Sequence, residues 1–229
     1  MAELRTAWEA LGYGGAMVYP LLALGVLAIL IILDRAVMYI RCLRMPSALS
    51  DLIETWEFSW ADLDRQLESL GSYNAYGRFF RVIAENRNKP AWWVESRAGD
   101  EAGAIEKTMN RGLWVLETVV TAAPLMGLLG TITGMMQAFK LIGGSGLVAP
   151  TQVTSGVAQA LIATALGLLI ALFALFGFNF FARTQSHALD MMERFGSRLI
   201  DHIRLDQESG EAAVASVTPL ASVEGRAKR

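Results

Sequence analysis

Among the polar side chains inside the apolar segments of this sequence, three could act on a permeating ion. Thr131 and Thr164 each lie near the middle of an apolar segment, and Gln159 precedes Thr164 by about one helical turn. Threonine hydroxyls both donate and accept hydrogen bonds, so this pair could line a narrow hydrated pore. The alternative is packing alone, because a threonine in a membrane helix most often returns its hydroxyl to a carbonyl of its own helix. The spacing alone leaves both roles open.

The same apolar segments contain no acidic or basic side chain. No Asp, Glu, Lys, Arg or His occurs in three long stretches, namely Ala10–Leu33, Thr118–Phe139 and Leu141–Ala182. An ionisable group inside the membrane is the usual mark of a proton relay. If this chain conducts protons, the titrating carboxylate must therefore come from a partner. Asp34 and Glu117 lie at the ends of spans, where we expect solvation at the interface, with Asp34 close to Arg35 or Arg41.

The polar side chains must be positioned by membrane-spanning helices. Of the 229 residues, 53% are apolar and 18% are charged, and the mean hydropathy is +0.37. About 20 apolar residues are needed to cross the hydrocarbon layer as a helix, which predicts spans near 16–40, 113–139 and 155–182. These spans must be helical because a chain with three apolar segments cannot close a barrel. The predicted fold is an all-α membrane protein with three transmembrane helices extended into a cytoplasmic helical bundle.

Small residues recur at helical spacing along the second and third spans. Such stripes allow two membrane helices to approach closely. The predicted packing positions are Gly127, Gly130 and Gly134 in the second span and Gly156, Ala160 and Gly167 in the third. Pro124 removes one backbone hydrogen bond and should bend the second span.

The distribution of Lys and Arg predicts the orientation. Ten of the 20 basic residues lie in 41–112 and seven in 183–229, whereas 140–154 holds only Lys140. By the positive-inside rule, the arm 1–15 and the loop 140–154 lie outside, and the region 41–112 and the tail 183–229 lie inside.

The cytoplasmic region is expected to be helical throughout. Helices should start at Pro46–Ser47, run from Trp60 to Gly71 and cover 74–87. A fourth should begin at Pro90 and continue unbroken into the second span. The tail continues as an amphipathic helix over 184–205, with disorder expected after about 207, where small and polar residues dominate.

Several functions are disfavoured by composition. The net charge of −2 gives no general basic character for nucleic acid. His187 and His202 have no metal-ligand spacing, and no nucleophile–base pair or phosphate loop is present. We therefore expect no enzyme activity, no metal and no cofactor. The single cysteine, Cys42, rules out an internal disulfide.

Two sequence blocks resemble a known family. APLMGLLGTITGMMQAF, ending at Phe139, and GVAQALIATALG, starting at Gly156, are similar to the second- and third-span signatures of the ExbB/TolQ/MotA proton-channel family. Asp34–Arg35 and the run from Arg111 to Trp114 also fit the family. Having three spans, the chain is closest to ExbB and TolQ.

The resemblance implies a mechanism and partners. Family members form a ring, a pentamer in the ExbB-like branch, around single-span ExbD- or TolR-like partners that carry the membrane Asp. Thr131 and Thr164 match the pore threonines, and Gln159 occupies a place where ExbB and TolQ commonly carry Glu. The implied location is a bacterial inner membrane, with the arm 1–15 and the loop 140–154 periplasmic and the region 41–112 and the tail 183–229 cytoplasmic. The implied function is a stator subunit that couples the proton gradient to work on the cell envelope. The alternative is a non-conducting oligomeric membrane scaffold.

Overall fold

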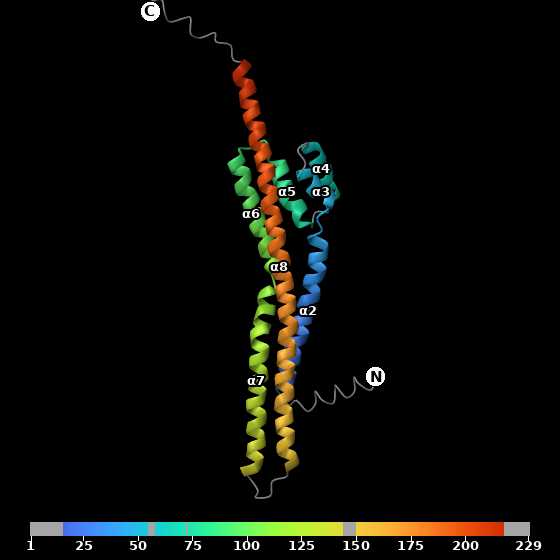
Figure 1. Cartoon of the computed structure of the whole chain (residues 1–229), viewed down its shortest axis with the longest axis vertical. Helices are drawn as coiled ribbons and strands as arrows, with labels where there is room; N and C mark the ends of the chain where they lie inside the picture. Colours follow the sequence, from blue (N-terminus) through green and yellow to red (C-terminus); the bar gives the residue numbers. More distant parts are fainter. Residues whose placement is uncertain (1–15, 55–57, 72, 144–149, 218–229) are drawn as a thin grey trace, which may run out of the picture. The chain divides into compact units, whose positions relative to one another are not determined.

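The computed structural model describes residues 16–54, 58–71, 73–143 and 150–217. Regular structure in this part of the chain is entirely α-helical, as predicted (Figure 1). The helices are α2 (Val18–Cys42), α3 (Ser47–Glu54), α4 (Trp60–Ser69), α5 (Ala75–Glu85), α6 (Ala91–Asn110), α7 (Leu113–Gly143) and α8 (Pro150–Val217). Three helical segments, Val18–Cys42, Ala91–Lys140 and Val153–Ser209, are long and apolar enough to cross a membrane, which confirms the predicted number of spans.

The chain divides into two compact units. The membrane unit comprises Met1–Tyr39 and Met109–Ser186, and the polar unit comprises Ile40–Thr108 and His187–Arg229. α2 and α8 each cross a boundary between these segments, so the polar unit contains the end of α2 and the second part of α8.

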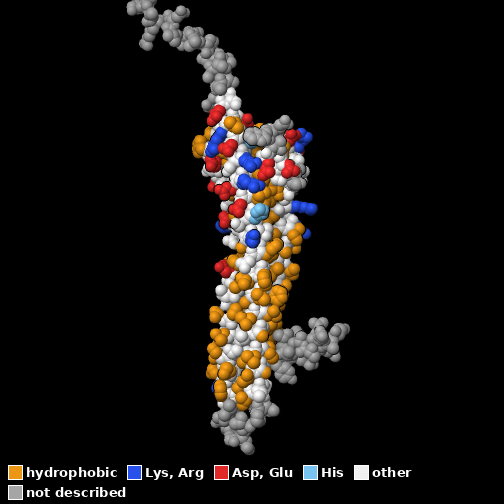
Figure 2. Space-filling model, in the orientation of Figure 1, with side chains coloured by type: hydrophobic (Ala, Val, Ile, Leu, Met, Phe, Trp, Pro, Cys, Tyr) orange, Lys and Arg blue, Asp and Glu red, His pale blue; other side chains and the backbone are white. Residues whose placement is uncertain are grey.

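The membrane unit is built from α2, α7 and the first part of α8. α2 lies against α8 where small residues face larger ones: a Cβ added to Gly177 would lie 2.9 Å from Ile32, and one added to Gly25 would lie 3.3 Å from Ile170. Near the end of α2, the rings of Tyr39 and Phe181 are 5.1 Å apart. The outer faces of these helices carry exposed Leu, Ile, Met and Phe (Figure 2). Such a large apolar surface is typical of a protein surrounded by lipid.

The polar unit has an aromatic and aliphatic core. Its fully buried side chains include Ile53, Leu63, Phe80, Ile83, Phe195 and Leu199. α5 begins at the N-cap Asn74, whose side chain accepts a 3.0 Å hydrogen bond from the backbone N–H of Gly77. Charged pairs on the surface link α8 to earlier helices, through Arg194–Glu54 and Arg204–Glu95, both 3.1 Å. This unit is therefore organised like a water-soluble helical domain.

The helix that was expected to run unbroken from Pro90 into the second span is interrupted. α6 ends at Asn110, a turn covers Arg111–Gly112, and α7 starts at Leu113. Gly112 has φ +86°, the left-handed conformation that glycine adopts without steric cost and that commonly ends helices. The prediction of an unbroken helix was therefore wrong. Gly99 and Gly103 lie inside α6 and stay helical, and nothing in the sequence shows that Gly112 ends the helix whereas they do not.

Disorder was expected after about 207, whereas α8 continues to Val217. The segment 208–217 contains several Ala and Glu, which are strong helix formers. Extending an existing helix is much less costly than starting one. The arm 1–15, residues 144–149 of the predicted loop and residues 218–229 lie outside the described residues.

Candidate functional site

Glycines of α7 and α8 bring the two helix backbones into direct contact. A Cβ added to Gly127 would lie 3.0 Å from the Cα atom of Thr164, and one added to Gly167 would lie 2.5 Å from the carbonyl oxygen of Ala123. Real Cβ atoms essentially never approach other heavy atoms more closely than 3.0 Å. Glycine at 167 is therefore a requirement of this helix crossing, since the backbone atom opposite cannot rotate away.

The contact continues toward the α7–α8 connection. A Cβ added to Gly134 would lie 3.0 Å from the Ala160 Cβ and 3.1 Å from the Gly156 carbonyl oxygen. One added to Gly156 would lie 2.9 Å from the Ala138 Cβ, and one added to Gly130 would lie 2.6 Å from the Ala163 Cβ. The six residues singled out in the sequence thus all lie along this α7–α8 contact, which we call the glycine seam: Gly127, Gly130, Gly134, Gly156, Ala160 and Gly167.

Thr164 makes a polar contact across the glycine seam. Its hydroxyl donates a 2.9 Å hydrogen bond to the backbone carbonyl of Gly127 on α7. The contact is partly buried. It forms because Gly127 has no side chain, so the α8 backbone comes close enough for a short side chain to reach a carbonyl of the other helix.

Thr131 uses its hydroxyl differently. It donates a 2.6 Å hydrogen bond to the carbonyl of Leu128 in its own helix. Thr133 likewise donates within α7, to Leu129 and Gly130. The hydroxyl protons of Thr131 and Thr164 are therefore both engaged, whereas each oxygen keeps acceptor capacity because a hydroxyl has two lone pairs.

The remaining predicted residues have less specific surroundings. Gln159 is half-buried and lies one helical turn before Ala163 on α8. Pro124 is accommodated inside α7, which continues through it as a helix. The carboxylate of Asp34 pairs with Arg35 at 2.7 Å, with the Asp34 side chain 67% exposed, as expected for an interfacial pair.

Two features of the membrane unit were not predicted from the sequence. The first is the contact between α2 and α8, in which Gly25 faces Ile170 and Gly177 faces Ile32. The signal that could have indicated it is a glycine among large aliphatic residues in each of these two spans. The second is a polar strip on the exposed face of α7, where Thr118 and Thr121 follow Glu117. Both hydroxyls donate to carbonyls within α7, including that of Glu117.

The chemistry available in the membrane unit is hydrogen bonding without proton uptake. The central parts of the spans carry hydroxyl and amide groups but no Asp, Glu, Lys, Arg or His, because the charged residues lie near the ends of the spans. A threonine oxygen can accept a hydrogen bond from a protonated carboxylic acid, and its own proton can be redirected to a carboxylate if its present bond breaks. The site is thus suited to receive a titrating group that another chain supplies.

Closely packed apolar helices with a few intramembrane hydroxyls define this molecule as a polytopic α-helical membrane protein. Residues 72–194, more than half of the chain, match the MotA/TolQ/ExbB proton channel family. The chain belongs to this family. It is 34% identical over 200 residues to the putative biopolymer transport protein ExbB-like 1 of Synechocystis. The matched region covers 81% of this chain and 74% of that protein.

Other relatives match over shorter shares of their length. The chain is 39% identical over 106 residues to the biopolymer transport protein ExbB of Xanthomonas campestris, covering 46% of this chain and 42% of that protein. It is 27% identical over 174 residues to a putative ExbB homolog of Methanothermobacter thermautotrophicus, covering 73% and 60%. Against these two relatives, the chain spans less than two thirds of their length.

Proposed function

We propose that this chain is the channel-forming stator subunit of a proton-driven motor in a bacterial inner membrane. The observation that carries the proposal is that a member of a proton channel family has three spans whose central parts contain no Asp, Glu, Lys, Arg or His. The proton-carrying group must then belong to a partner. An ExbD- or TolR-like single-span protein with a membrane Asp supplies that group, and a ring of this chain, a pentamer by family resemblance, encloses it.

Thr131 and Thr164 are the residues that face the partner's carboxylate in this proposal. The Thr164–Gly127 hydrogen bond supports the assignment because it places a hydroxyl within the close contact between α7 and α8. Gln159 contributes an amide that cannot titrate, so it would orient water or the carboxyl group without holding a proton.

The same proposal includes the orientation in the membrane. The excess of Lys and Arg in 41–112 and 183–229 supports a periplasmic N-terminus and α7–α8 connection, with the polar unit in the cytoplasm. Inward proton flow would supply roughly 2.3 kcal/mol for each charge that crosses 100 mV. A few protons are then enough for one conformational cycle that does work on the cell envelope.

A non-conducting oligomeric scaffold is the second candidate. It is favoured by the engagement of both hydroxyl protons in hydrogen bonds within the protein and by the glycine seam, which is a complete packing surface in itself. In a scaffold, the threonines would serve helix packing only, and no Asp-bearing partner would be needed.

The first test is the native mass of the tagged chain, purified in mild detergent from its own host. A ring that contains a small single-span protein with a membrane Asp is the expected result, and the identity of that partner would reveal the driven process. A homo-oligomer without such a partner, in detergents that preserve known complexes of this kind, would support the scaffold.

The second test measures cytoplasmic acidification after an external acid pulse in cells that express the chain with its partner. Thr131→Val and Thr164→Val should each lower proton entry while the complex still assembles. Thr133→Val is the matched control, because it removes a hydroxyl from the same span whose contacts lie within α7. Unchanged proton entry in both pore variants would contradict the assignment.

A further inference from the structure

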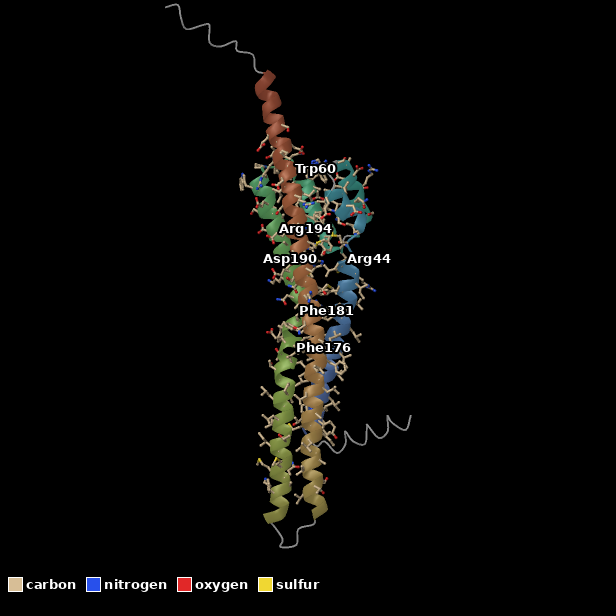
Figure 3. The ribbon with its side chains drawn as sticks, viewed as in Figure 1. Arg44, Trp60, Phe176, Phe181, Asp190 and Arg194 are labelled. Atoms are coloured by element: carbon tan, nitrogen blue, oxygen red, sulfur yellow. The ribbon has the colours of Figure 1, made fainter. Side chains whose placement is uncertain are left out.

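The polar unit contains a basic cleft at the end of α2. It has a volume of about 500 Å³ and lies between the segment that follows α2 and the loop that joins α4 to α5. Arg41 and Arg44 line one side, and Ser69, Leu70 and Tyr73 line the other, with Asn74 between them. Arg44 is labelled in Figure 3, just beyond the end of α2.

Asn74 fixes the two sides of this cleft to each other. Its side-chain amide donates a 2.7 Å hydrogen bond to the backbone carbonyl of Arg44, while its carbonyl oxygen accepts from Gly77. Its backbone N–H donates to the carbonyl of Gly71 at 3.0 Å. The buried Asn74 thus holds the non-helical segment 43–46 in place and sets the position of Arg44 before any ligand arrives.

The charge of the cleft is uncompensated among the described residues. Most arginines of the described chain pair with a carboxylate, namely Arg35, Arg65, Arg78, Arg87, Arg97, Arg194, Arg198 and Arg204. Arg41 and Arg44 are exposed and form no ion pair with a described carboxylate. The residues that line the cleft include no Asp or Glu. Two guanidinium groups in such a cleft are suited to bind a phosphate, which each can contact through two N–H donors.

The position of Arg41 along α2 determines what kind of phosphate it meets. The Asp34–Arg35 ion pair, whose Asp34 side chain is exposed, marks the end of the hydrocarbon layer on α2. Arg41 follows Arg35 by six residues, or about 9 Å of helix, and its long side chain, which leans toward the helix N-terminus, can reach back into a headgroup layer about 5–7 Å thick. Tyr73, 84% exposed in the same cleft, is of a residue type enriched at this interface.

We propose that this cleft binds the phosphate headgroup of an anionic phospholipid. The guanidinium groups of Arg41 and Arg44 contact the phosphate, and the exposed ring of Tyr73 lies beside the glycerol region. A lipid is favoured over a soluble phosphate because the cleft opens where headgroups are concentrated. The site is independent of the proton-channel proposal, since it lies outside the glycine seam and would operate equally in a scaffold.

The test is equilibrium binding of short-chain phosphatidylglycerol to the full-length complex in a neutral detergent, followed by native mass spectrometry. Short-chain phosphatidylcholine is the zwitterionic comparison, and glycerol 3-phosphate tests for a soluble phosphate site. We expect phosphatidylglycerol to bind preferentially. Arg41→Gln and Arg44→Gln should each weaken its binding about fivefold, given the attraction of a single basic residue to an anionic surface.

A matched control removes the same charge elsewhere. Arg65→Gln with Arg97→Gln deletes two exposed arginines of the polar unit outside the cleft, and this variant should keep the lipid preference.

Ser69→Glu adds a carboxylate to the cleft while both arginines stay, and it should abolish the preference without affecting assembly. Equal losses in the control and cleft variants would overturn the proposal, as would equal binding of glycerol 3-phosphate. A change of oligomer mass without a change in bound lipid would overturn it too, because the cleft would then be a contact between copies of this chain.

Discussion

The two units of this protein use side-chain volume in opposite ways. In the membrane unit, the helices pack through residues with almost no side chain, such as Gly127 and Gly167. In the polar unit, the helices pack through large side chains, such as those of Phe80 and Phe195, both fully buried. In lipid, burying an apolar side chain yields little because the surroundings are equally apolar, so close backbone packing is what stabilises the contact. In water, removal of apolar area is the main driving force. The polar unit should therefore fail when volume is removed, and the membrane unit when volume is added.

The largest effect is expected from Phe80→Ala in the polar unit. Phe80 packs edge-on against Phe79 and Phe195, with ring centroids 5.3 Å and 6.5 Å apart. Its loss should destabilise this unit by about 3–5 kcal/mol, since a buried cavity remains. Hydrogen exchange of the full chain in detergent should show faster exchange in α5. Phe173→Ala is the control: this ring of the membrane unit is 63% exposed, and its removal should change exchange little.

The second largest effect is expected from adding volume to the membrane unit. Gly167→Ala adds a single methyl group that would lie 2.5 Å from the Ala123 carbonyl oxygen, so α7 and α8 must move apart. We expect a loss of about 1–3 kcal/mol, the usual cost of overpacking, detected as a lower thermal midpoint in detergent.

The matched control for Gly167→Ala is Gly99→Ala in α6. Apart from the adjoining backbone of α6 itself, no atom lies within 4 Å of the position that its methyl group would occupy. This variant should stabilise α6 by about 0.5–1 kcal/mol, because alanine is the better helix former. Destabilisation by Gly99→Ala would contradict the account, since it would mean that the open face of α6 is as tightly covered as the glycine seam.

A smaller effect is expected from Thr164→Val, which keeps the shape and removes the hydroxyl. The loss should be about 0.6 kcal/mol and not more than about 1.7, the range measured for hydrogen bonds between membrane helices. Thr164→Ser keeps the hydroxyl and should retain most of the stability. A loss of stability as large as that of Gly167→Ala would show that polar contacts, and not backbone proximity, dominate the seam.

The smallest effect is expected from the surface of the polar unit. Arg204 pairs with Glu95 and Asp201 at 3.1 and 3.0 Å, and all three side chains are at least half exposed. Arg204→Gln should cost about 0.2–1 kcal/mol, as exposed ion pairs do. The difference from the unmodified protein should shrink further at high salt, because screening weakens exposed pairs.

The helices themselves were predicted better from the sequence than the residues at which they break or end. Apolar length located the three spans, and Pro46, Trp60 and Pro90 located the starts of inner helices. The break at Gly112 and the extension of α8 to Val217 were missed. Helix continuity at a glycine depends on the contacts around it, which local propensity does not contain.

The site shows the same limit. Sequence spacing identified the residues of the glycine seam, since small residues at helical intervals are visible without coordinates. It could not show that Thr164 donates to Gly127 while Thr131 donates within its own helix, because that difference depends on the register of α8 against α7. The basic cleft was missed as well, since Asn74 and Arg44 are 30 residues apart and only the fold brings them together.

The central claim is that the membrane unit provides hydrogen-bonding groups for proton transfer but no group that carries the proton. The most direct measurement is proton flux into liposomes that contain the purified chain, alone or assembled with its co-purified single-span partner, under an imposed potential. The account predicts no flux above background for the chain alone and flux with the partner, lost when the partner's membrane Asp is changed to Asn. Proton flux through the chain alone would contradict it.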